Sequence, residues 1–269
     1  MPVEINYTLS AGKNAENKYL ERNKFKSKLE GANKAIAITL NKIESQNKKI
    51  LEKQKNKINV LKKTEKKKEW YHKFRFFFTT NGFLVLGGKD TKNNDFLIKK
   101  YLKENDLYFH ADVHGAPHVI LKNDLKKEIL EEDKIEAACF ALIFSSAWKT
   151  KSFSAEVYSV SPDQVSKTAN TGESLGAGAF VIRGKRTYYK KLNLKLKLIY
   201  DSKLGLYPFP ILLTYKEDLR KDEFYLIPGS LKKSDVSKEI KNLYLKKGIS
   251  LSQEEIDSSL PPGSFELIK

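Results

Sequence analysis

The sequence predicts a mixed α+β protein, with a long N-terminal coiled-coil helix followed by a mostly antiparallel sheet domain with packed helices. Three observations support this prediction. Residues 14–68 contain no proline and one glycine, and apolar residues recur in them every seven positions. Asn81-Gly82, flanked by apolar runs, is a strong hairpin signal because both residues tolerate positive φ. Strand-like and helix-like segments then alternate without a glycine-rich phosphate loop.

The N-terminal helix is predicted from Leu29, Ile36, Ile43 and Ile50, which recur at seven-residue intervals among Lys, Glu, Asn and Gln residues. This is coiled-coil spacing, and a helix of about 55 residues would reach roughly 80 Å. A lone helix cannot bury such a stripe, and no second heptad segment of similar length follows. We therefore expect a homodimer, or pairing with the missing N-terminal half of a longer protein. A solvated lysine-rich helix is the alternative.

Changes in composition divide the chain into three predicted domains. They are a lysine-rich coiled-coil arm (1–68), a sheet domain (69–190), and a C-terminal α/β extension packed on it or following it (191–269). Strands are expected at 74–80, 83–87, 106–114, 118–123, 154–160 and 191–200. Within residues 176–189 we expect a strand rimmed by glycines and followed by a basic turn. Helices are expected at 91–103, at 133–149 with Asp133 as N-cap, and at 234–248, with a short acidic helix near the end. The proline-interrupted segment 207–215 is not expected to be a central strand.

The net charge of +17 favours a polyanionic partner, and nucleic acid is the commonest polyanion that a soluble protein meets. The charge is uneven. Residues 1–69 carry 18 Lys and Arg against 8 Asp and Glu, whereas the rest of the chain carries 32 against 25. A lysine-rich host proteome is the alternative explanation.

The cysteine count and the hydropathy pattern narrow the class of protein. Cys139 is the only cysteine, which excludes a disulfide framework and a thiolate metal cluster. No apolar run approaches the roughly 18 residues that a bilayer span requires, and the first residues lack the layout of a secretory signal. We therefore expect a cytoplasmic protein without membrane contact.

Three of the four histidines lie in the segment HADVHGAPH, residues 110–118. Glycine and proline within it argue against a helix, and on a strand His110, Asp112 and His114 would share one face. Imidazole and carboxylate suit a metal ion, but no fourth ligand is identifiable. The same groups suit contact with RNA by stacking and hydrogen bonding. A structural role in the following turn is the third alternative, and the residues alone leave all three open.

Basic residues also interleave with aromatic residues and glycine, a pattern suited to phosphate and base contact. These positions are Lys73, Arg75, Lys89, Lys99, Lys100, Trp148, Lys149, Lys151, Arg183, Lys185, Arg186, Tyr188 and Tyr189. The segment FVIRGKRTYY has the strongest local pattern, since its charge lies at a glycine-bent strand end, and an ordinary solvated turn is its alternative. Trp148 suits a core anchor better than a base platform, but it remains a candidate RNA contact.

A resemblance to the R domain of the NFACT family is carried by three stretches: WYHKFRFFFTTNGFLVLGGKDTKNNDFLIKKYLKENDLYFHADVHGAPHVILKN, SSAW, and PDQVSKTANTGESLGAGAFVIRGKRTYY. The stretch NYTLSAGKNAENKYLERNKFK and the lysine-rich helix resemble the family's coiled coil where it leads into this domain. Together they cover residues 3 to about 190. The resemblance implies a ribosome-associated quality control factor, which binds large ribosomal subunits obstructed by peptidyl-tRNA and recruits charged tRNA for untemplated C-terminal tailing.

The resemblance implies roles at the positions that match the family motif. Those positions are Arg75, Gly87, Gly88, Asp90, Asn94, His110, Asp112, His114, Gly115, Trp148, Gly172, Glu173, Arg183, Gly184 and Lys185. Lys89 stands where the family often has Arg, which keeps the charge and loses bidentate contacts. His118 falls where the family usually has a small or polar residue. We therefore expect His118 to be incidental, which weakens the metal hypothesis.

The implied function is a non-enzymatic RNA-binding module for tRNA and the large ribosomal subunit, without metal or cofactor. The expected RNA contacts are Arg75, Lys89, Asp90, Asn94, Lys99, Lys100, His110, Asp112, His114, Gly115, Trp148, Lys149, Lys151, Arg183, Lys185 and Arg186. By the resemblance, functions at the tRNA acceptor end belong to the family's N-terminal part, which is absent from this sequence. The alternatives are a metal-dependent RNA hydrolase using His110, Asp112 and His114, and a scaffold dimerised by the coiled coil.

Overall fold

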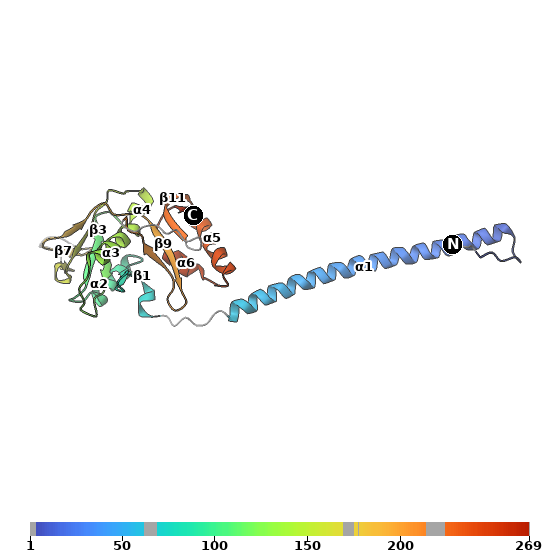
Figure 1. Cartoon of the computed structure of the whole chain (residues 1–269), viewed down its shortest axis with the longest axis horizontal. Helices are drawn as coiled ribbons and strands as arrows, with labels where there is room; N and C mark the ends of the chain where they lie inside the picture. Colours follow the sequence, from blue (N-terminus) through green and yellow to red (C-terminus); the bar gives the residue numbers. More distant parts are fainter. Residues whose placement is uncertain (1–3, 62–68, 169–174, 177, 214–223, 269) are drawn as a thin grey trace. The chain divides into compact units, whose positions relative to one another are not determined.

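The computed structural model describes residues 4–61, with the backbone alone from 50 to 61, and residues 69–168, 175–176, 178–213 and 224–268. The chain divides into two compact units, residues 1–63 and 64–269 (Figure 1). One long helix and antiparallel sheets are present, so the predicted mixed α+β class is confirmed.

The first unit is the helix α1, Ala11–Leu61, of 51 residues. Side chains fix its start. Ser10 Oγ accepts a hydrogen bond from Lys13 N at 3.3 Å, and Asn14 Oδ1 accepts one from Asn6 N at 2.9 Å. The first bond satisfies a backbone donor that the helix start leaves unpaired, and the second ties the preceding segment to the first turn of the helix.

The heptad positions of α1 form an apolar stripe that is not buried within this unit. Leu29, Ile36 and Ile43 are 63%, 57% and 46% exposed. The predicted helix is confirmed as far as Leu61, and its predicted continuation to residue 68 lies outside the described residues. Its pairing with a partner helix stays a prediction. Among the described residues, no helix combines the length and the apolar character that crossing a membrane needs.

The second unit contains a six-stranded antiparallel sheet in the order β1-β2-β4-β3-β5-β8. Its strands are β1 (Arg75–Phe78), β2 (Leu84–Gly87), β3 (Leu107–Ala111), β4 (Val119–Leu121), β5 (Val157–Val160) and β8 (Thr187–Tyr189). The predicted hairpin joins β1 to β2, with Phe78 opposite Leu84 and Gly82 at φ +85°. The helix α2, Thr91–Tyr101, follows β2.

A four-stranded sheet in the order β10-β9-β11-β12 is built from the C-terminal part of the chain. Its strands are β9 (Leu196–Asp201), β10 (Gly205–Pro210), β11 (Phe224–Leu231) and β12 (Phe265–Ile268), and the helices α5 (Lys233–Lys246) and α6 (Gln253–Ser259) lie between β11 and β12 in the chain. Pro208 and Pro210 lie in β10 at the edge of the sheet, where a missing N–H is tolerated. The prediction that this segment is not a central strand is confirmed.

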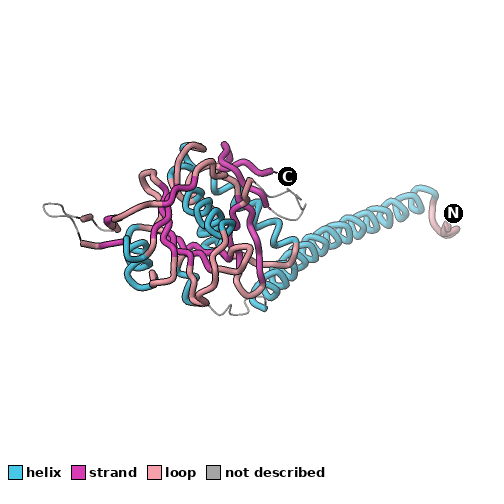
Figure 2. The backbone as a smooth tube through the Cα atoms, turned by 60° about the vertical axis from the view of Figure 1, so that its left-hand side comes forward, coloured by secondary structure: helices cyan, strands magenta, loops and turns pink. Residues whose placement is uncertain are grey.

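The helix α3, Glu131–Ile143, lies between the two sheets and contacts β3, β4 and β5 on one side and β10 on the other (Figure 1). Residues 137–143 of this helix are at most 1% exposed. One continuous apolar core joins them to strand residues of the first sheet and to Leu196 and Phe265 of the second. Figure 2 shows strands wrapped around a helix inside this unit. The division at residue 190 stays a prediction, but the segments on both sides of it share this core.

The helix predicted at 133–149 is in fact two helices. α3 begins after Leu130, and Asp133 lies in its first turn, where its carboxylate accepts from Leu130 N at 3.2 Å. Asp133 is therefore not the N-cap. Ser145 interrupts the apolar run and caps the short helix α4, Ser146–Thr150.

The segment 176–189, predicted as a strand followed by a basic turn, contains two strands that lie in different sheets. Its first part, β7 (Val181–Ile182), pairs with β6 (Val165–Ser166) in a two-stranded ribbon at the margin of the unit (Figure 1). Its second part is β8 in the large sheet. Gly184, at φ +78°, turns the chain between them.

Two buried carboxylates of α3 hold the β1–β2 turn. Glu136, 0% exposed, accepts from Thr80 N at 2.9 Å and from Thr80 Oγ1 at 2.5 Å. Asp133, also 0% exposed, accepts from Asn81 Nδ2 at 3.2 Å. These bonds satisfy the buried charges and dock the hairpin on the helix.

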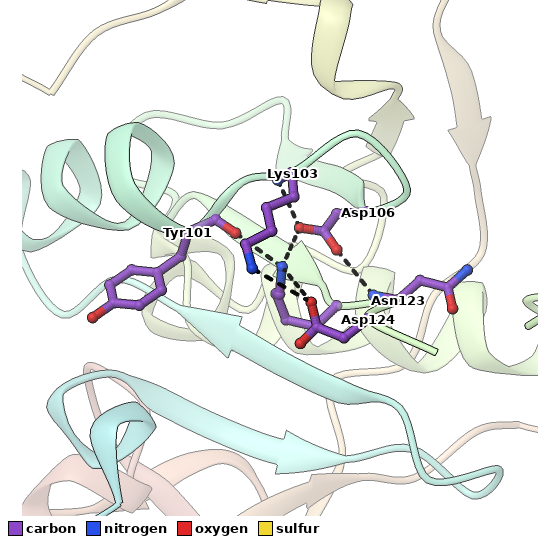
Figure 3. Close-up of polar contacts among 6 residues, drawn as sticks. Tyr101, Lys103, Asp106, Asn123 and Asp124 are labelled. Atoms are coloured by element: carbon purple, nitrogen blue, oxygen red, sulfur yellow. Dashed lines mark hydrogen bonds and ion pairs between the residues drawn. The ribbon is translucent and has the colours of Figure 1, made fainter. Parts of the chain in front are cut away.

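A buried ion pair joins the end of α2 to β3 and β4 (Figure 3). Lys122 Nζ lies 2.5 Å from Asp106 Oδ2, and the two side chains are 3% and 1% exposed. Asp106 also accepts from Lys103 N at 2.8 Å and from Asn123 N at 2.9 Å. Lys122 Nζ donates to Tyr101 O at 3.0 Å. Both charges are thus fully hydrogen-bonded, as buried charges require.

We expect Asp106→Ala to destabilise the second unit more than Lys122→Met. The first change leaves the buried ammonium group of Lys122 with only the exposed carboxylate of Asp124, 3.4 Å away. It also removes the acceptor of two backbone N–H groups, and we expect a cost on the order of 3–5 kcal/mol. The second keeps the aliphatic stem and leaves Asp106 with its backbone donors, so we expect roughly half that cost. Urea unfolding measures both, with the exposed Lys238→Met as control. Equal costs for the two variants would contradict this account.

Candidate nucleic-acid interface

A cleft of about 630 Å³ opens where β3, β5 and the start of β1 meet the start of α2 and the β6–β7 ribbon. It brings together residues that are far apart in the sequence. The sequence-predicted RNA contacts that line it are Arg75, Lys89, Asp90, Asn94, His110, His114 and Gly115.

Arg75 lies in this cleft with an incompletely paired guanidinium group. Nη1 donates to Gly88 O at 2.8 Å, and Cζ lies 5.0 Å from the centre of the Phe144 ring. Nε is buried and has no hydrogen-bond partner among the described residues. Burial lowers the pKa of Arg75 to about 10, an effect that nearby Asp90 opposes. The side chain therefore remains charged at neutral pH, and its buried Nε donor is unused.

Close packing fixes the wall of the cleft between β2 and α2. A Cβ atom on Gly88 would lie 1.8 Å from Asn94 Oδ1, so only glycine fits there. Asn94 Oδ1 accepts from His118 N at 3.2 Å, and Gly88 N donates to His118 O at 3.1 Å. Asp90 caps α2 by accepting from Asn93 N at 2.9 Å. Asp90 and Asn94 thus hold the wall together through internal hydrogen bonds.

His118 lies in the lining of the cleft, only 7% exposed, although the sequence indicated an incidental residue. Nε2 is 2.9 Å from Gly178 O, and because a carbonyl only accepts, Nε2 carries the proton. Nδ1 therefore accepts from the Tyr108 hydroxyl at 2.5 Å. Burial, with the neighbouring His110, lowers the pKa of His118 to about 4. As a neutral imidazole, His118 joins β3 to the segment that leads into β7.

His110 is half-buried beside it. Its Nδ1 donates to Pro117 O at 3.1 Å, and its ring stacks on His118 with centroids 4.8 Å apart. Burial lowers the pKa of His110. In the part of the chain that the structure describes, Nε2 has no hydrogen-bond partner and remains available as an acceptor.

The predicted common face of His110, Asp112 and His114 is not formed, because β3 ends at Ala111. His114 is exposed in the following turn, where its carbonyl accepts from Ser146 Oγ at 2.6 Å. No group of three or more His, Cys, Asp or Glu side chains within the described ranges is placed to hold a metal ion. The hydrolase alternative therefore has no support from the geometry of these residues.

Gln164 shapes the basic turn that precedes β8. Its Nε2 donates to Arg183 O at 2.7 Å and to Lys185 O at 3.0 Å, while Arg183 N donates to Gln164 O at 2.9 Å. A Cβ atom on Gly184 would lie 2.6 Å from Gln164 Nε2, so the turn also requires this glycine. The turn leaves the Arg183 and Lys185 side chains exposed. Sequence analysis missed Gln164, because its partners lie 19 and 21 residues away.

The basic turn adjoins the cleft through Arg186. Its Cζ lies 4.5 Å from the centre of the Tyr158 ring, and Tyr158 lines the cleft. The Tyr158 ring meets His110 edge-on, with centroids 6.0 Å apart. Arg186 and the cleft therefore belong to one continuous surface.

The prediction that Trp148 contacts RNA is wrong, because this residue is buried in the core. It is 1% exposed, its Nε1 donates to Ser264 O at 3.0 Å, and it packs against Phe265. A base therefore has no ring face to stack on. Lys149 and Lys151, in and after α4, are exposed but do not line the cleft.

The two predicted lysines of α2 also lie outside the cleft lining. Lys99 pairs with Asp95 at 2.6 Å, and Lys100 Nζ lies 5.3 Å from the Phe96 ring centre. Lys167 is a second partner of Asp95, at 2.7 Å, and also donates to Ala179 O at 2.9 Å. Hydrogen bonds from Lys167 and Lys99 lower the pKa of Asp95 to about 2. Asp95 therefore helps to attach the chain near Ala179 to α2.

Sequence analysis did not single out Tyr108, Tyr158 and Phe180, three aromatic residues that line the cleft. The sequence did hold a signal for Tyr108: it lies two residues before His110 on β3, so both side chains point to the same face of the sheet. Phe180 meets His118 edge-on at 5.2 Å, a contact that no local pattern indicates.

Comparisons with known proteins match the segment that builds this site. Residues 73–184 match the family described as NFACT protein RNA binding domain. The fold and this match define an RNA-binding domain. The chain belongs to the NFACT family. Of the positions that the resemblance implied, Gly172 and Glu173 lie outside the described residues.

Several curated proteins are similar over much of the chain. The archaeal Rqc2 homolog aRqcH of Methanocaldococcus jannaschii is 39% identical over 219 residues, which cover 80% of this chain and 32% of that protein. The ribosome quality control complex subunit NEMF homolog of Drosophila melanogaster is 34% identical, covering 73% and 20%. The chain thus spans about a third or less of the length of these relatives.

A solved structure is similar over a smaller part. It is the C-terminal part of the fibronectin/fibrinogen-binding protein from Streptococcus suis, with 28% identity and a TM-score of 0.38. The similarity covers 45% of each chain.

We expect acid to destabilise the second unit through His118. Its folded pKa of about 4 lies below the ordinary 6.5, so the unfolded chain takes up the proton first. The stability from neutral His118 is complete above pH 6.5 and is lost as the pH falls towards 4, by up to about 3 kcal/mol.

Urea unfolding at about pH 7, 5.5 and 4.5 measures this loss. His118→Gln is the matched control, because glutamine retains a donor near the Nε2 position and does not titrate. We expect this variant to lose less stability over the same range. Parallel losses in the two proteins would exclude His118 as the cause.

Proposed function

We propose that the second unit binds RNA through the cleft and the adjoining basic turn, as part of a ribosome quality control factor. One observation carries the proposal: the exposed cations Arg183 and Lys185 are held on an ordered turn that adjoins a cleft with an unpaired guanidinium donor. The match of residues 73–184 to an RNA-binding domain supports it independently.

The charges of this surface suit a phosphate backbone. Within the described residues, neither Arg183 nor Lys185 forms an ion pair with a carboxylate. Unpaired cations on a rigid support attract polyanions and release condensed counterions when they bind. Asp90 is the carboxylate in the cleft lining, and it already caps α2.

The relatives support the quality control role: two are named as subunits of a ribosome quality control complex, and one is an archaeal Rqc2 homolog. We propose tRNA and the large ribosomal subunit obstructed by peptidyl-tRNA as partners, in the cytoplasm. This chain would supply RNA contact without catalysis, whereas recruitment of charged tRNA for tailing would need the part of the relatives that it does not cover.

We expect tRNA binding to weaken steeply with salt, and Arg183→Ala/Lys185→Ala to weaken it further. The slope of log K against log salt is negative, and each lost phosphate contact should reduce its magnitude by roughly 0.7–0.9. Fluorescence anisotropy titrations over a series of salt concentrations measure both effects.

The control for this experiment is Lys238→Ala/Lys241→Ala, which removes the same charge from exposed positions of α5. Figure 1 shows α5 and β7 at opposite sides of the second unit. If the α5 variant lowered the slope as much as the turn variant, binding would follow net charge and not this surface.

A second candidate function concerns α1. Its exposed Leu29, Ile36 and Ile43 form a stripe that a second helix would bury. We propose that α1 pairs with another helix, either in a second copy of the chain or in a separate segment of a longer protein.

Light scattering at micromolar concentration tests the homodimer. We expect twice the mass of one chain for the wild type and the mass of one chain for Ile36→Lys/Ile43→Lys, because a charge at each seam position prevents packing. Lys34→Glu/Lys48→Glu is the control, because each of these exposed lysines lies five positions after a seam residue and so away from the seam. A monomeric wild type would reject the homodimer.

A further inference from the structure

The size and lining of the cleft suit a small organic anion better than a single ion. Its volume of about 630 Å³ lies within the range of roughly 300–1,000 Å³ that small-molecule sites occupy. Arg75, Lys89 and His114 line it, whereas its carboxylate, Asp90, is engaged with the backbone of α2. The lining therefore carries more positive than negative charge, which favours an anion.

Arg75 indicates an oxyanion at one part of the cleft. A guanidinium group carries five N–H donors in a flat fork, and buried examples normally pair with a carboxylate or a phosphate. Here Nη1 meets a neutral carbonyl, Cζ lies over the Phe144 ring, and buried Nε is unpaired among the described residues. Phosphate oxygens match both the charge and the planar geometry of this group.

His110 indicates a flat, hydrogen-bonding group at another part. Its ring is half-buried, stacks on His118, and keeps Nε2 free as an acceptor. Phe180 is half-buried on the same lining and meets His118 edge-on. Imidazole and phenyl rings support a base by stacking, and a free acceptor suits an exocyclic amine or a 2′-hydroxyl group.

We propose that the cleft holds one unpaired nucleotide of RNA, with its phosphate at Arg75 and its base against His110. This inference rests on the proposed function, because it names what the RNA presents to the cleft. The nucleotide is unpaired because a base within a duplex is stacked on both sides and has no face left for the rings that line the cleft. Arg183 and Lys185, outside the cleft, contact the adjoining backbone.

The first experiment uses the full chain with AMP, adenosine and inorganic phosphate, in calorimetric or saturation-transfer titrations at low salt. AMP is expected to bind in the millimolar range and more tightly than adenosine or phosphate, because only AMP reaches both groups. A single-stranded oligoadenylate should displace AMP, and a blunt RNA duplex should not. This comparison needs no variant, so it holds even if a substitution prevents folding.

The second experiment compares three variants whose folding is checked by thermal unfolding. Arg75→Lys keeps the charge but loses the planar set of N–H donors that can bind phosphate bidentately, and we expect the affinity for AMP to fall about tenfold. His110→Asn retains a donor near the Nδ1 position for Pro117 O and removes the stacking ring, with a similar loss of about tenfold. Arg183→Ala/Lys185→Ala should leave AMP binding unchanged while weakening tRNA binding.

The outcomes separate the two proposals. Salt-sensitive tRNA binding without AMP binding, or AMP binding that both cleft variants leave unchanged, would overturn the nucleotide site and keep the RNA surface. Displacement of AMP by the blunt duplex as well as by the single strand would also overturn it. AMP binding that oligoadenylate does not displace would assign the cleft to free nucleotides and reject an RNA ligand. Absence of tRNA binding at low salt would reject the proposed function itself.

Discussion

The need to bury α3 on every side is the constraint on which the rest of the second unit depends. A helix that is apolar almost all round cannot lie on the surface of a single sheet, because half of it would face water. The six-stranded sheet covers it on one side, and β10 of the four-stranded sheet covers it on the other. The strands after residue 190 therefore complete a core that the preceding segment cannot close by itself.

The same helix determines the geometry of the cleft. Phe144, directly after α3, lies beneath the guanidinium group of Arg75. A Cβ atom on Gly87 would come within 2.8 Å of Phe140 Cε1, so this glycine lets β2 lie against the helix. At its other end, Glu136 holds the β1–β2 turn. The residues around Arg75 are thus positioned by the core, and a change in α3 would move them together.

Local signals in the sequence predicted the elements whose conformation depends on near neighbours, such as the Asn81-Gly82 hairpin and the heptad helix. They also predicted that the proline-containing segment is not a central strand. They also selected seven residues that line the cleft. They did not predict the role of His118, because its partners Tyr108 and Gly178 lie 10 and 60 residues away. Nor did they show that β3 ends at Ala111, and this end prevents His110, Asp112 and His114 from sharing one face of a strand. Contacts at such separations leave no periodic pattern in the sequence.

The hydrogen bonds from Gln164 to the basic turn have a thermodynamic consequence. Fixing the backbone of one residue costs about 1–2 kcal/mol of conformational entropy, and a flexible basic tail meets that cost at every encounter with RNA. Here the backbone carbonyls of Arg183 and Lys185 are both held by hydrogen bonds from Gln164 before any RNA is bound. Such a preorganised turn presents its charges at fixed spacing. In the proposed interface it would discriminate among nucleic acids by the distance between their phosphates as well as by their charge.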